Sequence, residues 1–191
     1  IQAVTACALI IAGTVLGLAG IDLVLPAVPS MPTIFGTDTA TAQLVLAFYV
    51  AGSSLGLLIF GSLAAHIGRR RLFIGSLATF ALLSAAATFA GTIEILIFIR
   101  LLQGAAASGA AVLAPGLIRN LFSELGSIRA IAAMGSIESL TPGLAPILGA
   151  WLFSAYDWTA SFWITAILCT LLCTVMLLRP NMLPSIGTKA V

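Results

Sequence analysis

The sequence contains few charged residues. Asp, Glu, Lys and Arg make up only 7% of its 191 residues, whereas soluble domains carry about 25%. Hydrophobic residues account for 61% of the chain, which excludes a soluble globular domain and indicates an integral membrane protein. The net charge of +2 says little about partners, because the positions of charges matter more than their sum in a membrane protein.

Other features that are rare or missing in the sequence restrict the functions that it could have. The one histidine, His66, lies in a predicted turn, and no nucleophile stands with a base, so the sequence does not point to an enzyme. A re-entrant filter segment or a ring of charge, as channels use, is not visible. The cysteines lie in apolar stretches, and Cys169 and Cys173 share one helical face. We expect them to pack as small apolar residues rather than bind a metal or form a disulfide, and no cofactor is predicted.

Six long apolar segments are separated by turn signals and charged residues. Each is too long and too apolar for a strand, and segments of alternating polarity that would suit a membrane barrel are lacking. The segments cover about 2–25, 42–65, 72–90, 93–114, 131–153 and 160–178, and the first is expected to stop at Pro26. The predicted fold is therefore all-α, with 1–178 as one six-helix transmembrane bundle and 179–191 as the start of a cytoplasmic linker.

The basic residues predict the orientation of the bundle. Three consecutive arginines lie in the second connection and two more in the fourth: Arg69, Arg70, Arg71, Arg119 and Arg129. The first, third and fifth connections carry only acids: Asp38, Glu94 and Asp157. Because Lys and Arg gather on the cytoplasmic side, we expect a multi-pass protein of the inner (plasma) membrane with both chain ends in the cytoplasm.

The second connection also carries a motif. Residues 61–73 read GSLAAHIGRRRLF and resemble the loop between the second and third helices of the major facilitator superfamily. The residues that match the superfamily pattern are Gly61, Leu63, Ala64, Gly68, Arg69 and Arg70. The resemblance implies a gating loop, but Ala65 and His66 replace its acid and its following base. The alternative is that the arginines only fix the topology and contact anionic lipid, although Gly61 and Gly68 favour a close approach and a sharp turn of the two flanking helices.

Three further motifs extend the resemblance. GIDLVLPAVP in the first helix, with Asp22, is similar to a motif of twelve-helix drug/proton antiporters of the bicyclomycin and chloramphenicol resistance type. The fourth helix fits the family's intramembrane arginine motif at Ile97, Arg100, Gln103, Gly104 and Ala107. TPGLAPILGA in the fifth resembles the antiporter signature, with Pro146 and Gly149 in place and Ala145 and Ala150 instead of glycines. Together with these, Pro142 and Gly143 predict a kinked or loosened helix.

The resemblance implies a secondary active transporter. The chain would be the N-terminal six-helix half of a twelve-helix fold, built of two inverted three-helix repeats, and its partner would be the missing C-terminal half. It would export small amphipathic drugs or metabolites in exchange for protons by alternating access. The alternative is a truncated or half-module six-helix protein without transport activity of its own.

Three ionisable residues lie within the predicted spans: Asp22, Arg100 and Glu138. Such groups are costly in lipid and usually face a cavity or a partner. Asp22 and Arg100 both lie in the outer half and could meet, so burial would favour the neutral acid while the arginine would favour the anion. This balance suits proton coupling, and a purely structural ion pair is the alternative. Glu138 lies deeper and is either a cavity-lining acid or a helix-packing hydrogen bonder.

Overall fold

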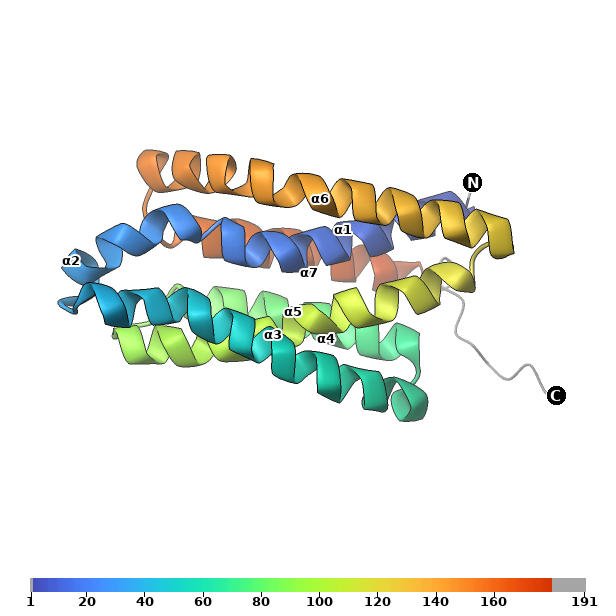
Figure 1. Ribbon diagram of the computed structural model, residues 1–191, viewed down its shortest axis with the longest axis horizontal. Helices are drawn as coiled ribbons and strands as arrows, with labels where there is room; N and C mark the ends of the chain where they lie inside the picture. Colours follow the sequence, from blue (N-terminus) through green and yellow to red (C-terminus); the bar gives the residue numbers. More distant parts are fainter. Residues whose placement is uncertain (1, 180–191) are drawn as a thin grey trace.

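The computed structural model describes residues 2–179. Within this range, six helical crossings are long and apolar enough to span a membrane, which confirms the predicted fold class. They run roughly along one long axis, so the turns gather at two ends (Figure 1). The elements are α1 (Gln2–Asp22), η1 (Leu25–Ser30), α2 (Met31–Phe35), α3 (Thr39–Ile67), α4 (Arg69–Ala87), α5 (Ile93–Arg119), α6 (Glu124–Ala155) and α7 (Ala160–Leu178).

The first crossing does not stop at Pro26, in contrast to the prediction from the sequence. It narrows into the 3₁₀ turn η1 and continues through α2 to Phe35. Pro26 and Pro32 occupy early positions of these two short helices, where a missing backbone N–H costs no helical hydrogen bond. The crossing ends at Gly36, whose left-handed φ of 64° suits a residue without a side chain.

Several other helices extend beyond their apolar segments. The connection predicted between segments 93–114 and 131–153 is only partly a turn, because α5 continues to Arg119 and α6 already begins at Glu124. Pro115, which follows the predicted end of segment 93–114, lies inside the continuous helix α5. Pro142 and Pro146 lie inside the continuous helix α6. The prediction stopped each helix where polarity begins, but polar side chains near a membrane surface can be solvated while the backbone stays helical.

Asp38 shows how such a helix begins at the surface. It is the N-cap of α3, and its carboxylate accepts hydrogen bonds from the backbone N–H of Thr41 at 2.9 Å and from the Thr41 hydroxyl at 2.8 Å. These bonds favour the ionised form and hold the pKa of Asp38 below its usual range.

The most intimate packing joins α3 to α5. A Cβ atom on Gly52 would lie 1.9 Å from the carbonyl oxygen of Leu101, and one on Gly104 would lie 1.9 Å from that of Tyr49. Gly56 is equally confined, since its Cβ would meet the Ser108 hydroxyl at 2.0 Å. The glycines therefore let the two backbones touch, as small residues do in closely packed membrane helices.

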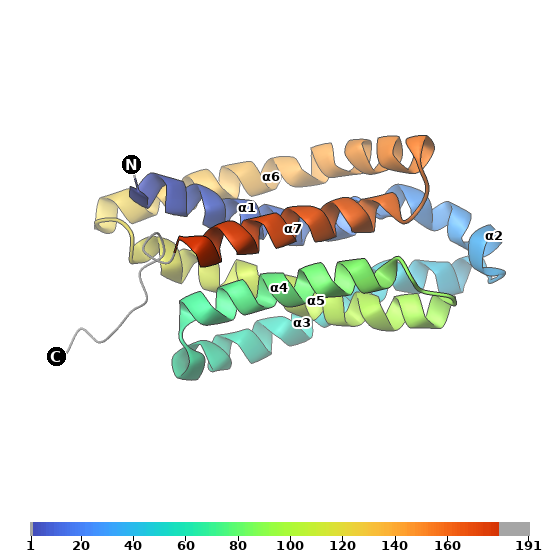
Figure 2. The ribbon, with the colours of Figure 1, turned by 180° about the vertical axis from the view of Figure 1, so that it is seen from behind.

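The bundle has two dissimilar sides. In Figure 1, α1, α3 and α6 lie toward the viewer, and Figure 2 brings α4 and α7 to the front. The spans α3 and α6 are the least buried of the six. Their exposed side chains include many large apolar ones, among them Leu55 and Leu58 on α3 and Leu144 and Ile147 on α6.

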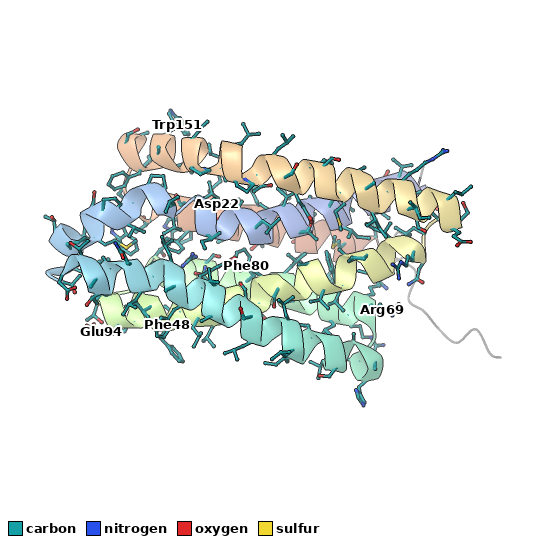
Figure 3. The ribbon with its side chains drawn as sticks, viewed as in Figure 1. Asp22, Phe48, Arg69, Phe80, Glu94 and Trp151 are labelled. Carbon is teal, nitrogen blue, oxygen red and sulfur yellow. The ribbon has the colours of Figure 1, made fainter. Side chains whose placement is uncertain are left out.

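The two ends of the bundle differ in charge. The α3–α4 and α5–α6 turns lie at one end, here called the basic end, with Arg69 among its arginines (Figure 3). The opposite, acidic end holds the turns with Asp38, Glu94 and Asp157. The predicted linker 179–191 lies outside the described residues except for Arg179.

Candidate functional site

Arg100 is the centre of the site. It lies on α5 and is fully buried, with 0% of its surface exposed. Its Nη1 donates to the carbonyl oxygen of Gly20 on α1 at 2.9 Å and to the side-chain oxygen of Gln103 at 3.2 Å. Its Nε donates to the carbonyl oxygen of Val45 on α3 at 3.3 Å. One guanidinium therefore joins three membrane-crossing segments.

Aromatic rings enclose the same guanidinium. Its Cζ lies 4.1 Å from the centre of the Tyr49 ring and 5.8 Å from that of Phe162. The Tyr49 hydroxyl donates to the carbonyl oxygen of Gly17 at 2.6 Å. A side chain on Gly20 would collide with Phe80 and Tyr49, so this glycine lets the rings approach α1. The contacts with the ring faces partly compensate the buried charge.

A polar chain continues from Arg100 across the bundle. The Gln103 amide donates to the Ser84 hydroxyl at 2.9 Å, and that hydroxyl donates to the carbonyl oxygen of Phe80 at 2.8 Å. Gln103 was part of the sequence motif but was not predicted as a site residue, and Tyr49, Ser84 and Phe162 were missed. Polar or aromatic residues within apolar spans were the available signal, but their partners come from other helices.

The charge of Arg100 has no counterion among the described residues. Its Nη2 is buried and has no hydrogen-bond partner, and no described carboxylate lies within the 4.0 Å of an ion pair. An uncompensated cation in a low-dielectric interior is costly. This part of the guanidinium can therefore still bind an anionic or polar partner.

Asp22 follows closely after the Arg100 contact on α1 but does not pair with Arg100. Asp22 is the last residue of α1 and is partly buried, and its carboxylate makes no described hydrogen bond or ion pair. The expected meeting of the two side chains is thus absent from this structure. The reason is helical geometry: Gly20, which contacts Arg100, and Asp22 are about 200° apart around α1. Figure 3 shows Asp22 on α1, between α6 and α3.

Glu138 lies on α6, at a different depth in the bundle from Asp22 and Arg100. The register of α1 and α6 is fixed where Gly149 meets Leu23, since a Cβ on Gly149 would lie 2.3 Å from the Leu23 carbonyl oxygen. Glu138 is eleven residues before Gly149 on α6, or roughly 16 Å along the helix. It is partly buried and, within residues 2–179, has no ion-pair partner. The structure therefore does not bring Glu138 to Asp22 or Arg100.

The residues of the antiporter-like motif on α6 differ in how far they are buried. Gly149 is buried against α1, whereas Pro142 and Gly143 are exposed and Pro146 is half-buried. The Leu23 carbonyl that Gly149 contacts also accepts a hydrogen bond from the Ser161 hydroxyl of α7 at 2.9 Å. The Leu23 carbonyl, which comes directly after the end of α1, is thereby held between α6 and α7.

The arginine turn differs in part from its prediction. Gly68 makes the expected sharp turn, with φ at 91°. A Cβ added at Gly61, however, would meet no atom within 4 Å, so the expectation that this glycine brings two helices together is wrong. The glycines that allow close approach are further up α3, against α5. Arg69 lies against Gly116 of α5, and Arg70 is half-buried.

A bundle of six membrane crossings built around a buried, uncompensated arginine is typical of membrane transporters. The model of the Major Facilitator Superfamily matches residues 10–190, and the chain belongs to this superfamily of transporters.

Several proteins similar to this chain are named for drug resistance. The chain is 31% identical to a chloramphenicol resistance protein of Pseudomonas aeruginosa over 75% of this chain and 34% of that protein. It is 30% identical to the chloramphenicol resistance protein CraA of Acinetobacter baumannii over 80% of this chain and 37% of that protein. It is 27% identical to the multidrug resistance protein MdtL of Escherichia coli O157:H7 over 78% of this chain and 38% of that protein. The chain thus spans well under half the length of these relatives.

Proposed function

We propose that these six helices form one half of a proton-coupled exporter of small amphipathic drugs, with Asp22 as the group that carries the proton. The observation that carries the proposal is the unpartnered Nη2 of the fully buried Arg100. Its neighbour Nη1 already holds Gly20, two residues before the one acid of α1. A rearrangement of the end of α1, where the regular helix stops at Asp22, would be needed to present the Asp22 carboxylate to the free donor.

The proposed cycle follows from this geometry. Ionised Asp22 pairs with Arg100 in one conformation, because two opposite charges in a low dielectric attract strongly. Protonation of Asp22 removes the attraction and releases α1 to the arrangement in which Arg100 holds only backbone and amide oxygens. Substrate and proton then bind in turn, as exchange of the two through a site of alternating access requires.

We also propose functions for the other candidate residues. Glu138 lines the cavity at a second depth, where it attracts cationic or polar substrates. Gly149 acts as the point about which α6 rocks against α1, and the exposed Pro142 and Gly143 face the opposing half of the transporter. The turn around Gly61, Gly68, Arg69 and Arg70 contributes less to gating than the superfamily pattern implies, because Ala65 removes the acid of that pattern.

The experiment is drug-driven proton movement in everted membrane vesicles. Chloramphenicol is the first substrate to add, because two relatives are named for resistance to it. We expect chloramphenicol to release protons from vesicles with the wild-type protein and to release none with Asp22→Asn. Glu94→Gln is the matched control, since Glu94 is an exposed acid in the first turn of α5, and it should retain wild-type activity. Equal activity of Asp22→Asn and wild type would refute the assignment of the proton.

A second candidate is a six-helix module that transports nothing alone. The observation that favours it is length, because the chain spans 34% to 44% of the three relatives named above and of a Shewanella oneidensis MdtL protein. The vesicle assay distinguishes the candidates when it is run on this chain and on any longer product of the same gene. Activity of the longer product alone would make these helices a half-transporter.

The orientation is part of the proposal. We infer that the basic end faces the cytoplasm and that the protein lies in the inner membrane, because basic residues are retained on the cytoplasmic side. A cysteine introduced for exposed His66 should react with a membrane-impermeant maleimide only in everted vesicles. A cysteine introduced for exposed Tyr156, at the acidic end, should react in intact cells.

A further inference from the structure

The basic end carries an unusual concentration of unpaired cations. Three arginines form the first turn of α4, and two more lie on the neighbouring ends of α5 and α6: Arg69, Arg70, Arg71, Arg119 and Arg129. The acid on the two turns at this end is Glu124. Among residues 2–179, none of these arginines forms an ion pair with a carboxylate. The surface therefore has a net positive charge that the described protein does not balance.

Arg69 is exposed, but part of its side chain lies against α5. Its side chain lies against Gly116 in the last turns of α5, where an added Cβ would meet Nε at 2.9 Å, Cδ at 3.0 Å and Cζ at 3.1 Å. This contact places part of the Arg69 side chain between the start of α4 and the end of α5. Because Gly116 has no side chain, there is room for Arg69 to lie against α5 here.

Arg70 holds an unsatisfied donor at the same turn. The side chain is partly buried, and its Nε is shielded from solvent yet has no hydrogen-bond partner. A buried donor without an acceptor is unfavourable and marks a position where an acceptor belongs. In the superfamily pattern an acid stands at the position of Ala65, four residues before Arg69, so the chain lacks the carboxylate that could neutralise this turn.

The backbone adds to the positive potential. No side chain caps α4, and its first intrahelical bond runs from the N–H of Leu72 to the carbonyl oxygen of Gly68. The amides of the three preceding arginines therefore have no helical acceptor. Cations are normally disfavoured at this positive end of a helix, so a bound anion would stabilise the three arginines there.

We propose that this arginine turn, with Arg69 and Arg70 as its principal ligands, binds the phosphate of an acidic phospholipid headgroup. A phosphate accepts several charge-assisted hydrogen bonds at once, and the planar guanidinium matches its oxygens. The last turns of α3 supply the surface for the acyl chains, since Leu58 is 76% exposed and Ile67, next to the turn, is 46% exposed. Exposed apolar side chains beside a phosphate ligand set favour a lipid over a soluble anion. The proposal is independent of the transported substrate.

The test compares three probes on the purified protein in a neutral detergent. Dioctanoyl phosphatidylglycerol, dioctanoyl phosphatidylcholine and inorganic phosphate are titrated separately, and the unfolding temperature is followed by tryptophan fluorescence. We expect saturable stabilisation by phosphatidylglycerol, with the other two probes far less effective at equal concentration. Equal effects of the two lipids would overturn the proposal, and equal effects of inorganic phosphate would replace it with a soluble-anion site.

Single substitutions locate the site. Arg69→Gln and Arg70→Gln should each raise the half-saturating concentration of phosphatidylglycerol about fivefold, the contribution of one arginine near an anionic surface. Arg129→Gln is the matched control, because Arg129 is an exposed arginine of the same end on α6 and lies outside the arginine turn, and its effect should be well below that of Arg70→Gln. An effect of Arg129→Gln as large as that of Arg70→Gln would show diffuse attraction and refute the site. If one glutamine variant does not fold, the other variant and the comparison of the two lipids on the wild type still decide.

Discussion

The guanidinium of Arg100 on α5 donates to the carbonyl oxygen of Gly20 on α1 at 2.9 Å, across a separation of 80 residues in the chain. The bond ties a buried cation to the backbone just before the end of α1. Asp22 follows two residues later and remains unpaired. The position of the end of α1 is therefore coupled to the charge of one arginine.

Replacing Arg100 should abolish transport without lowering the stability of the protein. Arg100→Met should leave the free energy of unfolding unchanged or raise it by about 1–4 kcal/mol, because removal of a buried charge without a counterion offsets the loss of its three hydrogen bonds. Proton-coupled efflux should be lost in the same variant. Unfolding temperature and vesicle transport measured on one preparation check both parts, and a large fall in unfolding temperature would contradict the first.

Glycines on α3 and α4 should respond oppositely to the same substitution. Gly52→Ala places a methyl group 1.9 Å from the Leu101 carbonyl oxygen, and forcing the helices apart should cost about 1–3 kcal/mol of folding free energy. Gly75→Ala on α4 meets no atom within 4 Å and should stabilise the protein by up to about 1 kcal/mol through helix propensity. Unfolding temperatures of the two variants check the prediction, and a tolerated Gly52→Ala would show that the helices are not in contact there.

The Leu23 carbonyl offers a test of the joint between α1, α6 and α7. Ser161→Ala removes its hydrogen bond and should cost about 0.5–1.5 kcal/mol. Gly149→Ala directs a Cβ at the same oxygen and should cost about 1–3 kcal/mol. Ser139→Ala is the control, because that serine is exposed and bonds only within α6. Similar unfolding temperatures for Ser139→Ala and Ser161→Ala would argue against the joint.

Asp38 should make the start of α3 sensitive to acid. Its pKa is held below the usual range by hydrogen bonds from Thr41, so the ionised cap stabilises the folded state above the unfolded-state pKa of about 3.9. This contribution is lost as the pH falls through the lower folded-state pKa. The protection factors of the amides in the first turn of α3 should therefore fall on acidification in the wild type, and much less in Asp38→Asn, whose amide caps without titrating. The same acid response in both proteins would exclude Asp38 as its source.

Much of the fold follows from local features of the sequence. The number of crossings and the sharp turn at Gly68 were predicted correctly because hydropathy and glycine positions act over short stretches. Helix ends were less accurate, as at Pro26 and Glu124, since a proline at an early helical position or a solvated polar turn does not end a helix.

The site was predictable only in part. Arg100 and Asp22 stood out as ionisable residues in apolar spans, and the roles proposed for them await experiment. Their lack of contact, and the place of Tyr49 and Gln103 around the guanidinium, depend on which helix faces which. Gly61 illustrates the same limit, because its motif suggested close packing where the structure has open space.

Composition, hydropathy and motifs are carried by the residues regardless of their neighbours, so they were enough to define a six-crossing membrane protein of a transporter superfamily with one strongly basic end. Other features emerged only from the packing of the helices: Arg100 holds α1, α3 and α5 together, Asp22 does not pair with it, and Arg69 rests on Gly116. Those relationships depend on helix register and rotation, which are set by contacts between residues far apart in the chain.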